Sequence, residues 1–178
     1  MTPMRSLATV LVLTVAFGVA GLYFAPNMSQ AIGGQKFGPF IPVIIDGDTL
    51  SDGENRFRLV GVDACEMGQP ITFDGYEQPL DCGFFAKSFV ERFIQDYHVI
   101  CHDQGSRSYG RIVARCFVNA GQDYTSIDND IGAFAVMSGW ATVTDHATGL
   151  FAARYIYEET LAQVSGRGAW RGAIVQQE

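Results

Sequence analysis

Side chains suited to phosphate chemistry are concentrated in three short stretches of the chain. The first reads D-G-D-T at 46–49 and follows an apolar, β-branched run. The second reads R-L-V-G-V-D-A-C-E at 58–66, and the third reads Y-G-R at 109–111. Hydrolysis of a phosphodiester needs an activated water, neutralisation of charge and help for the leaving oxygen. Carboxylates and arginines together can supply all three.

The carboxylates Asp48 and Asp63 are candidate metal ligands. Hard oxygen ligands favour Ca²⁺ or Mg²⁺, and the backbone carbonyl of Ala64 can be a third ligand. A turn at 51–55 separates predicted strands at 40–45 and 56–62, so the two carboxylates can face one another across a hairpin. An EF-hand loop is excluded, because Leu50 occupies its fifth position and no flanking helices are predicted.

Three further residues are candidates for catalysis. Glu66 follows Asp63 by three residues and can orient or deprotonate a water. Arg58 and Arg111 can grip phosphate oxygens and stabilise added negative charge. Each motif alone has an ordinary structural explanation in turn or surface chemistry, but their combination favours a phosphodiesterase.

The elements that must position these residues indicate a small α+β domain. Apolar periodicity and capping signals predict three helices, at 82–96, from Asn129 or Asp130 to Ser138, and at 150–164. Further strands are expected at 99–101 and 111–118, flanking a turn at 103–108. Residues 67–81 show no periodicity and predict a long surface loop near the acidic cluster.

The N-terminal 31 residues predict export. They carry one charge, Arg5, before an apolar run from Leu7 to Ala25. This apolar helix is either a membrane anchor, which the length of the run favours, or a signal peptide cut near Ala31. A buried helix of a soluble domain is the third possibility. Residues 32–41 are glycine-rich and predict a linker.

The motifs V-I-x-D-G-D-T, R-L-x-G-V-D-A-x-E and Y-G-R-x-V-A, in this order, resemble those of the staphylococcal nuclease-like (thermonuclease) family from Val43 to Trp170. The resemblance implies an OB-type five-stranded β-barrel packed by three helices, here at 42–172 with a tail at 173–178. It also implies a monomeric, Ca²⁺-dependent endonuclease that cleaves DNA and RNA and leaves 3′-phosphate ends.

The same resemblance implies a role for each matched residue. Asp48, Asp63 and the Ala64 carbonyl match the calcium ligands of the family, and Asp46 matches a carboxylate of the outer shell.

On the catalytic side, Arg58, Glu66 and Arg111 match the catalytic trio of the family. Tyr109 matches a tyrosine on the substrate side.

Several positions depart from the family pattern. Ala64 and Cys65 replace a threonine and a proline, and Ser108 stands where a lysine can attract phosphate. Asp145 and His146 occupy a segment in which tyrosines can stack on bases. With a net charge of −7, these changes favour a second hypothesis, a nuclease-like module that binds nucleic acid or serves the envelope without turnover. Hydrolysis of a smaller phosphodiester is a third possibility.

The four cysteines of an exported chain predict two disulfides. Cys101 and Cys116 lie on strands that flank one turn, which leaves Cys65 to pair with Cys82. A zinc site at Cys101, His102 and Cys116 is the alternative, although no short C-x-x-C spacing supports it.

Overall fold

The computed structural model describes residues 34–119, 121 and 124–174. These residues belong to one compact unit, Ile32–Glu178. The predicted apolar helix and cleavage position at 1–31 lie outside the described residues, as does most of the predicted C-terminal tail. No helix within the described ranges has the length and apolarity needed to cross a membrane.

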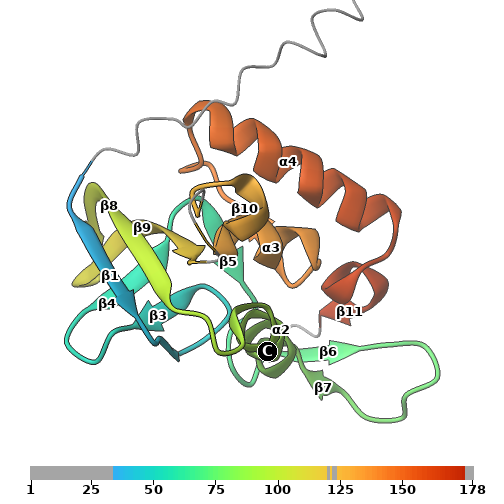
Figure 1. The fold of residues 1–178 in the computed structure, drawn as a ribbon. Helices are drawn as coiled ribbons and strands as arrows, with labels where there is room; N and C mark the ends of the chain where they lie inside the picture. The colour runs from blue at the N-terminus through green and yellow to red at the C-terminus, as the bar shows by residue number, and fades with distance from the viewer. Residues whose placement is uncertain (1–33, 120, 122–123, 175–178) are drawn as a thin grey trace, which may run out of the picture. The chain divides into compact units, whose positions relative to one another are not determined.

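Six strands form the main sheet, in the spatial order β1-β8-β9-β4-β3-β2 (Figure 1). Their bounds are β1 Lys36–Phe40, β8 Val99–Ser108, β9 Arg111–Val118, β4 Arg56–Leu59, β3 Thr49–Ser51 and β2 Val43–Ile44. The β4–β9 pair is parallel and the other pairs in this sheet are antiparallel. Because β1 and β2 are consecutive in the chain yet lie at opposite ends of the order, residues 36–44 link the two edges of the sheet.

Side-chain alternation along β4 separates the core from the outer face. Phe57 and Leu59 are buried, whereas Arg56 is exposed and Arg58 lies partly exposed. Asp52 closes the turn before β4. Its Oδ1 accepts hydrogen bonds from the backbone N–H groups of Glu54 and Asn55. Such an Asx turn is the local reason that the predicted hairpin forms here.

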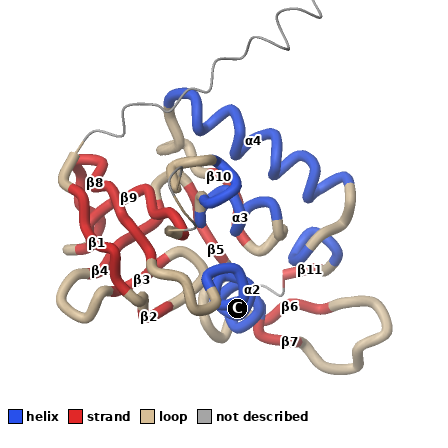
Figure 2. Tube along the Cα trace, viewed as in Figure 1, coloured by secondary structure: helices blue, strands red, loops and turns tan. Residues whose placement is uncertain are grey.

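Three α-helices lie beside the sheet (Figure 2) and confirm the predicted α+β class and helix number for the described residues. They are α2 Cys82–Ile94, α3 Ile131–Met137 and α4 Gly149–Val164. Asp130, one of the two cap residues that the sequence predicted, caps α3 by accepting from Ala133 N at 3.2 Å. Phe93 of α2 stacks on Phe134 of α3 with ring centroids 4.1 Å apart.

Two smaller sheets complete the described secondary structure. One pairs β5 (Val62–Ala64) with β10 (Ala141–Val143), and the other contains β6 (Pro70–Thr72), β7 (Leu80–Asp81) and β11 (Ala173–Ile174). Two 3₁₀ turns occur, at Ile127–Asn129 and Gly168–Arg171.

Four expectations from the sequence were wrong in detail. The surface loop expected at 67–81 contains the β6–β7 hairpin. The turn expected at 103–108 is strand, because a bulge between Asp103 and Arg107 lets β8 continue to Ser108. The strand expected at 56–62 ends at Leu59, and Asp63 lies on the separate strand β5.

The fourth concerns the glycine-rich linker expected at 32–41, of which Lys36–Phe40 forms β1. Its aromatic side chains hold it to the core: the rings of Phe37 and Phe40 lie 5.2 and 5.5 Å from that of Phe57.

Both predicted disulfides are present, Cys65–Cys82 and Cys101–Cys116. Cys101 and Cys116 are direct cross-strand partners on β8 and β9, which overturns the zinc alternative with His102. His102 is instead buried, and its Nε2 lies 3.1 Å from the Tyr124 hydroxyl. Two disulfides are typical of proteins from oxidising, extracytoplasmic compartments.

A buried polar cluster joins the sheet to two helices. Arg115 Nε donates to Asp130 Oδ2 at 2.7 Å, and the Tyr155 hydroxyl donates to Asp130 Oδ1 at 2.7 Å. Burial and the adjacent carboxylate raise the pKa of Tyr155 well above its ordinary value. All three residues are buried, so this cluster holds the fold together and offers no route to a substrate.

Candidate functional site

Asp48 is the buried centre of the site, with 3% of its surface exposed. Its Oδ2 accepts from Ala64 N at 2.9 Å, and its Oδ1 accepts from Thr49 Oγ1 at 3.0 Å. The chain reaches this position only because residue 47 is glycine, since a Cβ there would lie 2.6 Å from the Ala64 side chain. The loop between β2 and β3 therefore places the Asp48 carboxylate in contact with the backbone of β5.

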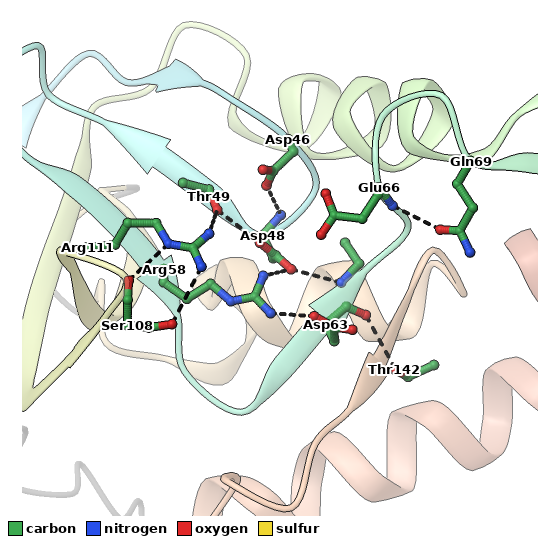
Figure 3. A network of polar contacts seen from close by, with 11 residues as sticks. Asp46, Asp48, Thr49, Arg58, Asp63, Glu66, Gln69, Ser108, Arg111 and Thr142 are labelled. Carbon is green, nitrogen blue, oxygen red and sulfur yellow. Dashed lines mark hydrogen bonds and ion pairs between the residues drawn. The ribbon is translucent and has the colours of Figure 1, made fainter.

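Arg58 bridges the two predicted metal ligands (Figure 3). One terminal nitrogen of its guanidinium pairs with Asp48, and the other pairs with Asp63. The Asp63 side chain is 57% exposed because its strand neighbours Val62 and Ala64 point into the core. The two carboxylates thus converge on one cationic group, from two separate strands.

Arg111 belongs to the same network and lies on the side away from Asp63 (Figure 3). Its Nη1 donates to Thr49 Oγ1 at 3.2 Å, and its Nε donates to the Ser108 carbonyl at 3.2 Å. Thr49 in turn donates to Asp48. A two-residue turn sets this position: Tyr109 and Gly110 have φ values of +50° and +79°, as expected for a tight hairpin turn before β9.

Glu66 is exposed and stands at the start of the loop after β5. Its backbone N–H donates to Gln69 Oε1 at 3.0 Å, and its carboxylate points toward the side on which Asp46 and Asp48 lie (Figure 3). The preceding Cys65 is bonded to Cys82 at the first turn of α2. Gly83 allows close approach, because a Cβ there would lie 2.2 Å from the Glu66 carbonyl oxygen.

The remaining predicted site residues are placed differently. Asp46 accepts from Asp48 N at 3.0 Å and so shapes the loop rather than contacting an arginine. Tyr109 is 99% exposed and projects from the β8–β9 turn, outside the hydrogen-bonded network.

The residues present fit a hard divalent cation, although no group of three His, Cys, Asp or Glu side chains in the described part of the chain is arranged to hold one. The carboxylates of Asp48 and Asp63 both pair with the Arg58 guanidinium. The space between the two carboxylates therefore stabilises a positive charge. A backbone carbonyl and waters can complete such a shell. Any cation between them must displace Arg58 from at least one carboxylate.

Three residues of the network were missed by sequence reasoning. Thr49 links Asp48 to Arg111, Gln69 holds the Glu66 backbone, and Ser108 anchors Arg111. The available signal for Thr49 was its place directly after Asp48 in the D-G-D-T motif; its register opposite Arg58 is seen only in the structure.

Two comparisons with known proteins bear on this arrangement. The sequence model of a family described as staphylococcal nuclease homologue matches residues 56–172. The chain is also 30% identical over 130 residues to the succinoglycan biosynthesis protein ExoI of Rhizobium meliloti (strain 1021). That alignment covers 72% of this chain and 62% of the relative, so the chain spans less than two thirds of the relative's length.

Proposed function

Because the chain belongs to the staphylococcal nuclease homologue family, we propose that it is an exported, Ca²⁺-dependent endonuclease. It hydrolyses phosphodiester bonds of DNA and RNA and leaves 3′-phosphate ends. The observation that carries the proposal is the joint placement of two carboxylates and two arginines in one hydrogen-bonded network, with Glu66 at its edge.

Asp48, Asp63 and the Ala64 carbonyl are the proposed cation ligands, and Asp46 holds the loop that presents Asp48. A bound Ca²⁺ would supply Lewis-acid polarisation of a phosphoryl oxygen and a template for the attacking water. Asp48 is buried, and Arg58 compensates its charge in the structure.

Arg58 and Arg111 are proposed to bind the phosphate under attack. Both are partly buried and held by side-chain contacts, so their charge is positioned before the substrate arrives. Glu66 is the proposed general base. Its exposed carboxylate can receive a proton from water, while its backbone is fixed by Gln69 and by the neighbouring disulfide.

The proposed fold of residues 42–172 is an OB-type barrel. The main sheet has six strands in place of the five expected, because Lys36–Phe40 of the expected linker adds β1 at its edge. Export is proposed from the charge and apolar run of residues 1–31, retained as an anchor or removed near Ala31, and it accords with the two disulfides. The active species is proposed to be a monomer.

A second candidate function is a module that binds without hydrolysis. The matched relative is a succinoglycan biosynthesis protein, and a biosynthetic role of that kind does not require hydrolysis of nucleic acid. The net charge of −7 also disfavours tight electrostatic binding of nucleic acid.

The test compares three forms of the full chain, the natural sequence, Glu66→Gln and the control Glu77→Gln, on single-stranded DNA and on RNA, with Ca²⁺ or with chelator. Glu77 is an exposed glutamate of the β6–β7 loop, so its change removes the same charge outside the network. Cleavage should require Ca²⁺, and Glu66→Gln should lower it about 10²–10⁴-fold while Glu77→Gln does not. Binding without any cleavage by the natural sequence would favour the second candidate.

A further inference from the structure

A third arginine stands beside the two of the proposed active site. Phe57 of β4 pairs with Ile112 of β9, and both side chains point into the core. The residues that precede them, Arg56 and Arg111, therefore lie side by side on the outer face, where neighbouring strands are about 4.8 Å apart. Arg58 is on the same face, two residues further along β4, at a rise of roughly 6.6 Å.

Arg56 and Arg111 line one hollow of about 520 Å³. The other lining residues are Glu54, Asn55, Tyr109, Gly110 and Ile112. Arg111 belongs both to this hollow and to the proposed catalytic network. A nucleic-acid strand whose phosphate is held by Arg58 and Arg111 can therefore extend directly into the hollow.

The charges of this surface differ from those of the protein as a whole. The chain carries a net charge of −7, yet the hollow presents two guanidinium groups against one carboxylate, that of Glu54. Arg58 is already paired with two carboxylates. Among the residues placed by the structure, no carboxylate lies within ion-pair distance of Arg56. An exposed, unpaired arginine beside a substrate-facing arginine is available to bind an anion.

We propose that Arg56 binds the phosphate adjacent to the one being cleaved, so that the enzyme distinguishes a polynucleotide from an isolated phosphodiester. The inference rests on the proposed nuclease function and assigns a specificity-determining role to a residue outside the catalytic trio. Arg56 acts on substrate binding and not on the bond-breaking step, because it contacts neither the carboxylates nor Glu66. Glu54, in the same hollow, opposes phosphate binding and tunes its strength.

The first experiment measures kcat and KM of the full chain on three thymidine dinucleotides: one with a single internal diester, one with an added 5′-phosphate and one with an added 3′-phosphate. One added phosphate should raise kcat/KM, mainly through KM, by about 10-fold, as expected for a charge-assisted hydrogen bond. Arg56→Gln should abolish that gain. The control Arg92→Gln removes one exposed arginine on α2 and should leave the gain intact.

The second experiment needs no turnover. Binding of a single-stranded oligonucleotide to Glu66→Gln is followed by fluorescence anisotropy at several salt concentrations, with and without Arg56→Gln. Losing one phosphate contact should lower the slope of log K against log salt by about 0.7, and Arg92→Gln should not change it. The inference is overturned if Arg56→Gln weakens all three dinucleotides equally, or if it leaves the slope unchanged. If the natural sequence cleaves single-stranded DNA but no dinucleotide, the salt slope alone decides the subsite; if it cleaves neither DNA nor RNA, the proposed function fails, and the salt slope still tests the subsite.

Discussion

Removal of either disulfide should lower the free energy of unfolding, but only removal of Cys65–Cys82 should strongly lower catalytic activity. The bonds Cys65–Cys82 and Cys101–Cys116 have sequence separations of 17 and 15 residues. The loop-closure relation then gives stabilisations of about 3.1 and 3.0 kcal/mol at 25 °C. We therefore expect the double variants Cys65→Ala/Cys82→Ala and Cys101→Ala/Cys116→Ala to lose similar free energies of unfolding, with a further cost at the second pair because both of its cysteines are buried in the sheet.

Activity should respond differently. Cys65 adjoins Glu66, and its bond to Cys82 holds the Glu66 loop against the first turn of α2. Loss of this bond should lower kcat by about 10²-fold, since a misplacement of roughly 1 Å can cost that much. Cys101 and Cys116 lie within the β8–β9 pair, away from the network, so their loss should leave kcat of the folded protein within a few-fold.

The assay is urea unfolding of both variants, followed by turnover of single-stranded DNA in buffer where each variant is almost fully folded. Adding Glu66→Gln to the first variant should then cause a smaller loss of activity than the same change causes in the natural sequence. The reasoning is refuted if the Cys65/Cys82 variant keeps full kcat, or if both variants lose kcat to the same extent at equal folded fraction.

Three other changes have expected outcomes. Gly47→Ala should destabilise the protein by about 1–3 kcal/mol in urea unfolding and lower the proposed nuclease activity, because the new Cβ would clash with two alanine side chains and shift the β2–β3 loop that carries Asp48; unchanged activity would contradict this. Asp130→Asn should cost about 3–5 kcal/mol, because it leaves the buried Arg115 guanidinium without its counter-charge, and thermal unfolding against Asp128→Asn, an exposed acid in the preceding turn, is the check. Burial, aided by nearby positive charges, lowers the pKa of His102 from its ordinary 6.5, so the unfolded state binds the proton more readily and stability falls as pH drops below about 6.5. His102→Gln should flatten that dependence by at most about 1.4 kcal/mol per pH unit, and an unchanged pH profile would exclude His102 as its source.

The parts of the fold that follow from strong local signals could be predicted from the sequence. The helix α2, the cap of α3 at one of two adjacent candidates and the pairing of Cys101 with Cys116 each depend on residues close to one another in the chain or on opposite strands of one hairpin. The proximity of Asp48 to Asp63 followed from the predicted hairpin, although the structure places Asp63 on a strand of its own.

The parts that could not be predicted depend on contacts between distant segments. Strand β6 has three residues and begins with Pro70. Its partners are β7, which starts at Leu80, and β11, which starts at Ala173, so no neighbouring residue indicates that it is a strand. Strand β8 continues through Gly105 because a bulge absorbs the irregularity. The bridging position of Arg58 likewise results from the β2–β3 loop being pressed against β5, and no local pattern encodes that approach.

The parallel pairing of β4 with β9 has a consequence for the order in which the molecule can assemble. It joins Phe57 to Ile112, so closing this pair costs the entropy of a 55-residue chain segment, whereas the β3–β4 hairpin forms locally. Arg58 can therefore meet its carboxylates early in folding, but Arg111 joins them only after β8 and β9 have formed and docked. A slip of one residue in that docking would turn Arg111 inward and Ile112 outward. During refolding, recovery of catalytic activity should accordingly lag behind recovery of strand and helix content, and its rate should follow the docking of β9.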